Sequence, residues 1–432
     1  MVLQWKLFGG SSIDLNSGFR AALSVLENTN KNVFITGRAG TGKSTLLQCF
    51  RDGTRKNIAV LAPTGVAALN VRGQTLHSFF RFRTDVTPDS VGRLPYQGQR
   101  AKYENLDAII IDEISMVRAD LLDCVDAFMR LNGRDGSLPF GGVQMIFIGD
   151  LYQLPPVVTH AEAEMFRGHY RSQYFFDSRA FGGLRVELVE LDGHYRQKDE
   201  AFIGLLDAIR ANTVTDQQLE SLNTRFNPAY TSDRHITLTS TNRLADAINT
   251  ERLQRLRGEE HEYMASVDSF ERELPADEKL RVRVGMRVMM LNNDKEGRWV
   301  NGSLGTVAAA SPNTITVKLD EGGEVEVGPY KWELFKFAYD SQRRRLVSRP
   351  VGSFTQLPIM PAWAVTIHKS QGKTFDRVII DIGSGTFAHG QLYVALSRCR
   401  TLDGIVLRQR IEKRHVLTDS RVADFLLGWR KG

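Results

Sequence analysis

Short apolar runs, each followed directly by a glycine, a proline or an acidic residue, recur through the first part of the chain. Runs without alternating polar residues are typical of strands that are buried on both faces of a sheet. Helical stretches lie between these runs. The alternation of strand and helix predicts an α/β unit with a mostly parallel sheet over roughly residues 30–185. The expected strands are 33–36, 58–62, 108–111 and 143–148, and the expected helices include 44–51 and 119–131.

A second α/β unit is predicted further along, with strands at 236–239, 364–367, 378–382 and 405–407 and a helix at 243–256. The long interval between its first two strands has a different texture, because residues 281–354 form short alternating segments divided by glycine. Apolar residues alternate on both sides of Gly322-Gly323, which is a hairpin pattern. We interpret the interval as a small all-β barrel inserted into the second unit; a structural spacer is the alternative.

Composition excludes several classes of protein. The 432 residues are 42% hydrophobic and 25% charged, as in ordinary globular proteins, and no apolar run is long enough for a membrane span. Met1–Ser12 lacks the features of a secretory signal. Cys49, Cys124 and Cys399 show no CxxC spacing, which argues against disulfides and zinc. We therefore expect a cytoplasmic protein without membrane contact, and its net charge of +6 permits a nucleic-acid partner without proving one.

Residues 37–44 (GRAGTGKS) fit the phosphate-binding loop GxxxxGK[ST]. The context is right, because a predicted strand precedes the loop and a predicted helix follows it. Glycines let the backbone N–H groups wrap around phosphate oxygens, and the helix N-terminus favours negative charge. Lys43 is expected to reach the β- and γ-phosphates of a nucleotide, and the Ser44 hydroxyl is expected to hold Mg²⁺.

Two further loops carry polar side chains at the ends of predicted strands. Asp112 and Glu113 follow the strand 108–111, where open α/β sheets bind ligands. We expect Asp112 to stabilise Mg²⁺ and Glu113 to orient or deprotonate the attacking water. Gln153 follows the strand 143–148 and is a candidate for hydrogen bonding to a γ-phosphate, although an ordinary loop glutamine is an equal alternative.

The order of these segments resembles a superfamily 1 helicase of the Pif (petite integration frequency) family, in the RecD/Pif branch known as superfamily 1B. The resemblance covers about residues 33–400, and the segment 199–210 (DEAFIGLLDAIR) is similar to a signature of the Pif branch. Besides the three segments above, it rests on 62–68 (APTGVAA), 75–80 (TLHSFF), 149–156 (GDLYQLPP), 195–197 (YRQ), 366–374 (TIHKSQGKT) and 394–398 (VALSR).

The resemblance implies a fold of two RecA-like P-loop NTPase domains with a small inserted all-β SH3-like barrel. The first domain would cover residues 1–187. A short insert within it, at about 81–103, could form a wedge that splits duplex, and an idle surface loop is the alternative. The second domain would comprise 188–280 and 355–432, and the barrel would be 281–354.

The resemblance also implies roles at the nucleotide. Arg196 and Arg398 would be arginine fingers that reach from the second domain and stabilise charge on the transferred phosphoryl group. Segment 14–19 (DLNSGF) lacks the glutamine with which related helicases read adenine, so the base preference stays open. The expected nucleotide contacts are Ala39, Gly40, Thr41, Gly42, Lys43, Ser44, Thr45, Gln153, Arg196, Gly372 and Arg398.

Contacts with a single DNA strand are expected from similar positions in such helicases. Threonine and lysine give phosphate contacts that do not depend on sequence, whereas histidine and phenylalanine offer stacking faces. Phe79 could instead belong to the core, and His77 could satisfy a buried partner. The expected DNA contacts are Pro63, Thr64, His77, Phe79, Asn242, Thr366, His368 and Lys369.

The activity implied by the resemblance is that of a monomeric helicase, dependent on ATP and Mg²⁺, that moves 5′-to-3′ on single-stranded DNA. It would unwind duplex or G-quadruplex DNA in repair, recombination and telomere maintenance, and would associate with the nucleoid in a bacterial host. A translocase that does not separate strands, an RNA helicase of superfamily 1 and a non-catalytic binding module are the alternatives.

Overall fold

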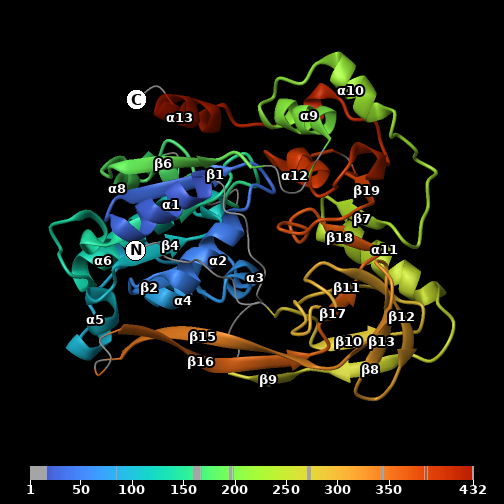
Figure 1. Cartoon of the computed structure of the whole chain (residues 1–432), viewed down its shortest axis with the longest axis horizontal. Coiled ribbons are helices and arrows are strands. Elements are labelled where there is room, and N and C mark those ends of the chain that lie inside the picture. The colour runs from blue at the N-terminus through green and yellow to red at the C-terminus, as the bar shows by residue number, and fades with distance from the viewer. Residues whose placement is uncertain are drawn as a thin grey trace.

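The computed structural model of the protein describes residues 17–83, 85–158, 166, 168–193, 197, 199–269, 274–340, 342, 345–383, 385–386 and 388–430. Two α/β lobes lie side by side, and an all-β region extends beneath them (Figure 1). Among the described residues, no helix combines the length and the apolar character needed to cross a bilayer.

The first lobe is built on a parallel sheet with the strand order β3-β2-β4-β5-β1-β6. Helices cover both faces of this sheet, so successive residues of a central strand enter different cores. Val33 and Ile35 of β1 pack with α1 and α2, whereas Phe34 between them packs on the opposite face with α6. The strands are β1 (Asn32–Gly37), β2 (Ile58–Ala62), β3 (Gln74–Thr75), β4 (Ala108–Ile111), β5 (Gln144–Ile148) and β6 (Val186–Leu191), and the helices include α1 (Ser17–Asn28), α2 (Lys43–Gly53), α3 (Gly65–Asn70), α4 (Leu76–Phe80), α5 (Gln97–Glu104), α6 (Ala119–Asn132) and α8 (Arg179–Gly182).

The second lobe has a parallel sheet with the order β18-β7-β19-β20. The strands predicted in both lobes are confirmed to within about a residue at either end. The elements are β7 (Ile236–Thr239), β18 (Ala364–Thr366), β19 (Val378–Asp381) and β20 (Ile405–Leu407), with α9 (Glu200–Arg210), α10 (Asp216–Asn223), α11 (Asn242–Arg255) and α12 (Gln391–Ser397).

The predicted boundary between the lobes, at residue 187, is wrong. It falls inside β6, which pairs with β1 over its whole length and is the edge strand of the first sheet. Two glutamates interrupt its sequence VELVEL, so it lacks the unbroken apolar run by which the other strands were predicted.

The all-β region begins earlier and ends later than the predicted 281–354. The strand β8 pairs with β10, β9 pairs with β16, and β17 pairs with β11. The predicted hairpin around Gly322-Gly323 is confirmed, because β13 and β14 pair antiparallel on either side of it. The strands are β8 (His261–Met264), β9 (Ser266–Asp268), β10 (Lys279–Val282), β11 (Arg287–Met290), β12 (Leu304–Ala310), β13 (Ile315–Leu319), β14 (Glu324–Val327), β15 (Tyr330–Asp340), β16 (Arg345–Gln356) and β17 (Ile359–Pro361).

The long hairpin β15–β16 runs from the all-β region beneath the first lobe (Figure 1). Its backbone N–H at Phe337 donates to Oε1 of Gln74 at 2.9 Å, and the Phe337 ring lies 5.9 Å from that of Phe79. The hairpin therefore contacts the first lobe.

The last described helix, α13 (Ser420–Arg430), packs on the first lobe, although it follows the second lobe in the chain (Figure 1). Val422 and Leu426 belong to the core of the first lobe. The Phe425 ring stacks on Phe176 at 4.3 Å, and Trp429 lies edge-on to Phe34. The assignment of residues 355–432 to the second domain is therefore wrong for this helix.

Candidate functional site

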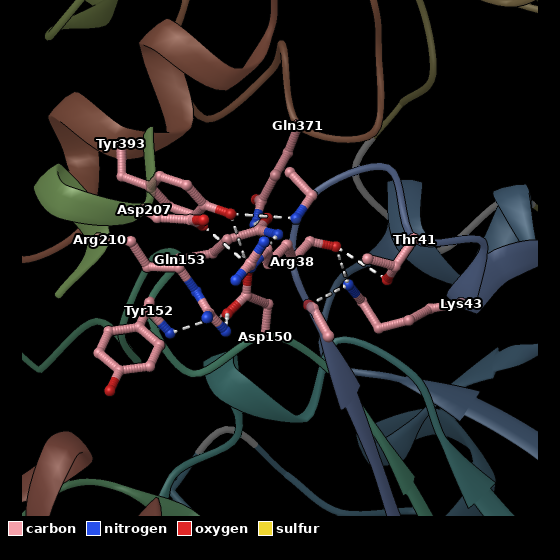
Figure 2. Close-up of polar contacts among 12 residues, drawn as sticks. Arg38, Thr41, Lys43, Asp150, Tyr152, Gln153, Asp207, Arg210, Gln371 and Tyr393 are labelled. Atoms are coloured by element: carbon pink, nitrogen blue, oxygen red, sulfur yellow. Dashed lines mark hydrogen bonds and ion pairs between the residues drawn. The ribbon is translucent and has the colours of Figure 1, made fainter. Parts of the chain in front are cut away.

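The phosphate-binding loop lies between β1 and α2, as predicted. Gly40 and Gly42 have φ values of 83° and 88°, a left-handed backbone that favours glycine. The Lys43 ammonium donates to the carbonyl oxygens of Gly37 at 2.7 Å and Arg38 at 2.9 Å (Figure 2). The loop thus has the turn that a phosphate requires, and its lysine reaches back across it.

Three carboxylates surround the lysine. Asp112 and Glu113 follow β4 and Asp150 follows β5, which is its neighbour in the sheet, so all three lie at the carboxyl edge. Burial lowers the pKa of Lys43, and the charges of Asp150, Glu113 and Asp112 oppose this effect. The structure therefore brings together the lysine and the acidic pair that the sequence predicted, and adds a third carboxylate.

The acidic pair has raised pKa values. Burial, together with the charge of Glu113, raises the pKa of Asp112 to about 7. Burial also raises the pKa of Glu113, while Lys43 and Arg398 act to lower it. A cationic ligand at this edge would relieve the repulsion between these carboxylates.

The residues predicted to hold Mg²⁺ fit such an ion. Ser44 is exposed in the first turn of α2, and Asp112 is buried directly after β4. No group of three or more acidic, histidine or cysteine side chains suited to a metal occurs in the part of the chain that the structure describes. A hydroxyl and one carboxylate are the usual protein share of a Mg²⁺ site, in which nucleotide phosphates and water supply the remaining ligands.

Asp150 is fully buried and is held by several donors. The Arg210 guanidinium on α9 forms an ion pair with it at 3.1 Å, and the Gln153 side-chain amide donates to it at 3.2 Å. Burial acts to raise the pKa of Asp150, but Arg210 and Lys43 hold it below the usual value. The Arg210 guanidinium also lies 4.4 Å from the centre of the Tyr152 ring. Asp150 is therefore a fixed anion between the lobes.

Side chains of the second lobe reach the loop directly (Figure 2). The Tyr393 hydroxyl on α12 accepts a hydrogen bond from the backbone N–H of Ala39 at 3.0 Å. Arg38 forms an ion pair with Asp207 of α9 at 2.9 Å. The loop is therefore part of the seam between the lobes.

Gln153 is buried, and its Oε1 accepts a hydrogen bond from Nε2 of Gln371 in the second lobe at 3.3 Å. Gly372, the next residue, is exposed with a φ of 77°. The structure thus brings the predicted residues Gln153 and Gly372 close together across the seam.

Arg398 is 1% exposed at the C-terminus of α12. Its guanidinium donates to the Val394 carbonyl at 3.0 Å and to the Ser397 hydroxyl at 2.9 Å. Its charge acts to lower the pKa of Glu113, so the two groups interact across the seam. Arg196, the other predicted arginine finger, lies outside the described residues.

The predicted DNA contacts differ in accessibility. Asn242 and Lys369 are exposed, at the start of α11 and after β18. Pro63, Thr64, His77 and His368 are half-buried, and burial lowers the pKa of both histidines. Thr366 is buried, and its hydroxyl accepts a hydrogen bond from the Lys369 N–H at 3.2 Å.

The expectation that Phe79 offers a stacking face is wrong for this structure. Phe79 is 0% exposed and packs edge-on against Phe80 and Tyr103 in the core of the first lobe. The structure therefore supports the alternative that Phe79 belongs to the core.

Sequence reasoning gave no role to several residues of the seam. Asp150 had a usable signal, because it follows an apolar strand just as Asp112 does. Tyr393 had none, since its partner Ala39 is 354 residues away in the chain. The residues missed are Arg38, Asp150, Asp207, Arg210, Gln371 and Tyr393.

Comparison with known proteins agrees with this site. The family model described as PIF1-like helicase matches residues 14–220, and that of the UvrD-like helicase C-terminal domain matches 361–406. An ATP-dependent DNA helicase Pif1 of Bdellovibrio bacteriovorus is 32% identical over 426 residues, which cover 96% of this chain and 92% of that protein. The human ATP-dependent DNA helicase PIF1 is 33% identical over 93% of this chain, but the match spans only 62% of the human protein.

Solved structures agree as well. Pif1 from Bacteroides sp in complex with ADP-AlF4 matches with a TM-score of 0.89 and 36% identity over 97% of this chain and 98% of that chain. Bacteroides Pif1 bound to ssDNA matches with a TM-score of 0.71 and 37% identity over the same shares. The chain as a whole is therefore more similar to the former structure. Together, the site and these similarities show that the chain belongs to the PIF1-like helicase family.

Proposed function

We propose that this chain is an ATP-dependent DNA helicase that moves along single-stranded DNA and separates strands. One observation carries the proposal: the loop suited to phosphates is hydrogen-bonded to the second lobe through Tyr393, so a nucleotide held there lies at the seam. Movement of one lobe against the other is then linked to the nucleotide. The names of the relatives and the ADP-AlF4 and ssDNA complexes of similar proteins support ATP and single-stranded DNA as ligands.

The residues of the seam have roles that follow from their chemistry. Lys43 binds the β- and γ-phosphates, and Glu113 orients or deprotonates the attacking water. Arg398 stabilises the negative charge that spreads over the transferred phosphoryl group. Bound Mg²⁺, held by Ser44 and Asp112, supplies neutralisation of phosphate charge.

DNA is proposed to cross the carboxyl edges of both sheets. Thr64 follows β2, Asn242 follows β7, and His368 and Lys369 follow β18, so each lobe contributes polar groups at the same kind of edge. Two separate grips on one strand, moved by ATP-driven closure, produce a step along it. The family resemblance supports 5′-to-3′ movement, action on G-quadruplex DNA, a monomeric state, an SH3-like barrel in the insert, and work in the cytoplasm near the nucleoid of a bacterial host.

The segment 81–103 is proposed as the wedge that divides duplex. Tyr96, which precedes α5, is 69% exposed and offers an aromatic face at the surface. Phe82 and Leu94 in the same segment pack against the core of the first lobe, which gives the segment a firm base.

ATP hydrolysis measured with single-stranded DNA, with RNA of the same sequence and without nucleic acid tests the proposal. We expect strong stimulation by DNA and weaker stimulation by RNA. Equal or stronger stimulation by RNA would instead favour an RNA helicase, and hydrolysis that ignores both would contradict the proposed function.

A further inference from the structure

The phosphate-binding loop and the second lobe meet at a buried phenol. The Ala39 N–H donates to the Tyr393 hydroxyl at 3.0 Å, and both residues are buried (Figure 2). The Ala39 side chain belongs to the core cluster of the second lobe, together with Leu392 and Tyr393 itself. A movement of the second lobe at this point therefore pulls on the backbone of the loop.

Asp150 fixes the direction of this hydrogen bond. A hydroxyl carries one proton, and the Tyr393 O–H donates that proton to Oδ2 of Asp150 at 3.4 Å. Asp150 is ion-paired with Arg210, so it can only accept. The lone pairs of the Tyr393 oxygen are then left for the Ala39 N–H. Two groups of the first lobe, Ala39 and Asp150, thus hold the phenol of the second lobe.

The helix that carries Tyr393 also carries Arg398. Helix α12 extends from Gln391 to Ser397, and Arg398 caps its C-terminus. The two residues are five positions apart, which is a rise of about 7.5 Å along a helix axis. At the other end, the N-cap Gly390 lies so close to the first lobe that a Cβ atom there would be 2.3 Å from the Tyr152 carbonyl oxygen. Gly390 and Tyr393 therefore fix the position of the helix relative to the first lobe. The position of Arg398 depends on the position of this helix.

We propose that Tyr393 is a positioning residue for ATP hydrolysis: its hydroxyl registers α12 against the Ala39 amide and thereby sets where the Arg398 guanidinium stands relative to the phosphates. The inference rests on the proposed function. Its importance follows from geometry, since a misplacement of about 1 Å at a reacting centre can cost a factor of about 100 in rate.

Tyr393→Phe tests the role because it removes the hydroxyl and keeps the ring. Kinetics of ATP hydrolysis with saturating single-stranded DNA should show kcat lowered about fivefold, the worth of one net hydrogen bond, with KM for ATP changed less than about twofold. Tyr263→Phe is the matched control, because Tyr263 is also buried and its hydroxyl donates to the Ser311 carbonyl at 2.6 Å, far from this site in the all-β region. The control should keep kcat and KM, and both variants should melt at similar temperatures.

A double-mutant cycle shows whether Tyr393 acts through Arg398. Arg398→Lys keeps a positive charge but loses the planar fork, so it lowers kcat on its own. If Tyr393 only positions Arg398, adding Tyr393→Phe to Arg398→Lys should lower kcat by clearly less than the fivefold seen in the unaltered chain.

Three results would overturn the inference. The first is an unchanged kcat in Tyr393→Phe, and the second is a full fivefold loss in the Arg398→Lys background. The third is a drop in melting temperature that accounts for the lost activity, because it would show a merely structural role. Absence of hydrolysis by the unaltered chain would be different, since it would contradict the proposed function itself.

Discussion

Glu113 has a backbone φ of 51°, a left-handed conformation that few residues other than glycine adopt. Such a conformation costs on the order of 1–3 kcal/mol and persists only where the surroundings impose it. Here Glu113 follows β4 directly and begins the turn Ile114–Met116. Its side chain makes no capping hydrogen bond to that turn, and its charge acts on Lys43, which supports a role in the reaction.

Contiguous residues of the site could be predicted, and residues brought together by the fold could not. The loop 37–44 and the pair Asp112–Glu113 can each be recognised from one short stretch of sequence. The role of Tyr393 depends on its hydrogen bond with Ala39, and no local sequence pattern predicts that contact. Phe79 was misassigned because an aromatic side chain reads the same whether it faces a base or a core.

Lys373 gives a residue-scale prediction about pH. It is half-buried, its ammonium donates to Oδ1 of Asn301 at 2.5 Å, and burial lowers its pKa to about 8. The unfolded chain keeps this proton up to about pH 10.4, so between those values the unfolded state binds more protons. The cost of burying the ammonium is therefore full below pH 8 and is relieved as the pH rises.

Lys373→Met removes this titration. Between pH 7.5 and pH 9.5, the denaturation midpoint of the unaltered chain should rise relative to that of Lys373→Met. The same comparison with Lys318→Met, a change at an exposed lysine, should show no such rise. A constant difference between the chain and Lys373→Met across that range would refute the prediction.

At the scale of elements, α13 is the main surprise. Its apolar residues Val422, Phe425, Leu426 and Trp429 have the spacing of one helix face, so a helix could be predicted there. Periodicity shows that a face must be buried but does not show against which core. The position of α13 in the chain favoured packing on the second lobe. In the structure it packs on the first lobe, through aromatic contacts with Phe34 and Phe176.

Neighbouring leucines on α13 test this packing. Leu426 is 7% exposed within the core of the first lobe, and Leu427 is 50% exposed. Leu426→Ala should lower the free energy of unfolding by about 3 kcal/mol, and Leu427→Ala should change it by less than about 0.5 kcal/mol. Chemical denaturation of both variants checks this; equal effects would show that the helix does not dock as described.

The segment 81–103 needs a gentler test than deletion. Because Phe82 and Leu94 pack on the core, removing the segment would expose apolar surface and disturb the lobe. Tyr96→Ala leaves this base intact, and we expect it to slow unwinding of a tailed duplex severalfold while DNA-stimulated ATP hydrolysis stays within about twofold. Leu138→Ala, which removes another exposed side chain of the same lobe, is the control. Unwinding at the normal rate by Tyr96→Ala would show that the Tyr96 ring does not contribute to strand separation.

At the scale of the whole molecule, contacts of different chemistry join the two lobes in the described residues. Polar contacts link the phosphate-binding loop to α9 and α12, the hairpin β15–β16 reaches beneath the first lobe, and α13 returns to it (Figure 1). The sequence predicted two α/β units and an insert from the order of strands. It could not predict their placement, because residues hundreds of positions apart determine it.

The central claim is that nucleotide turnover at this seam drives movement along DNA in one direction. Unwinding of two duplexes that differ only in carrying a 5′ or a 3′ single-stranded tail, with and without ATP, tests it most directly. The account predicts strand separation of the 5′-tailed duplex only, and only with ATP. Separation without ATP, or none with either tail while ATP is hydrolysed, would contradict it.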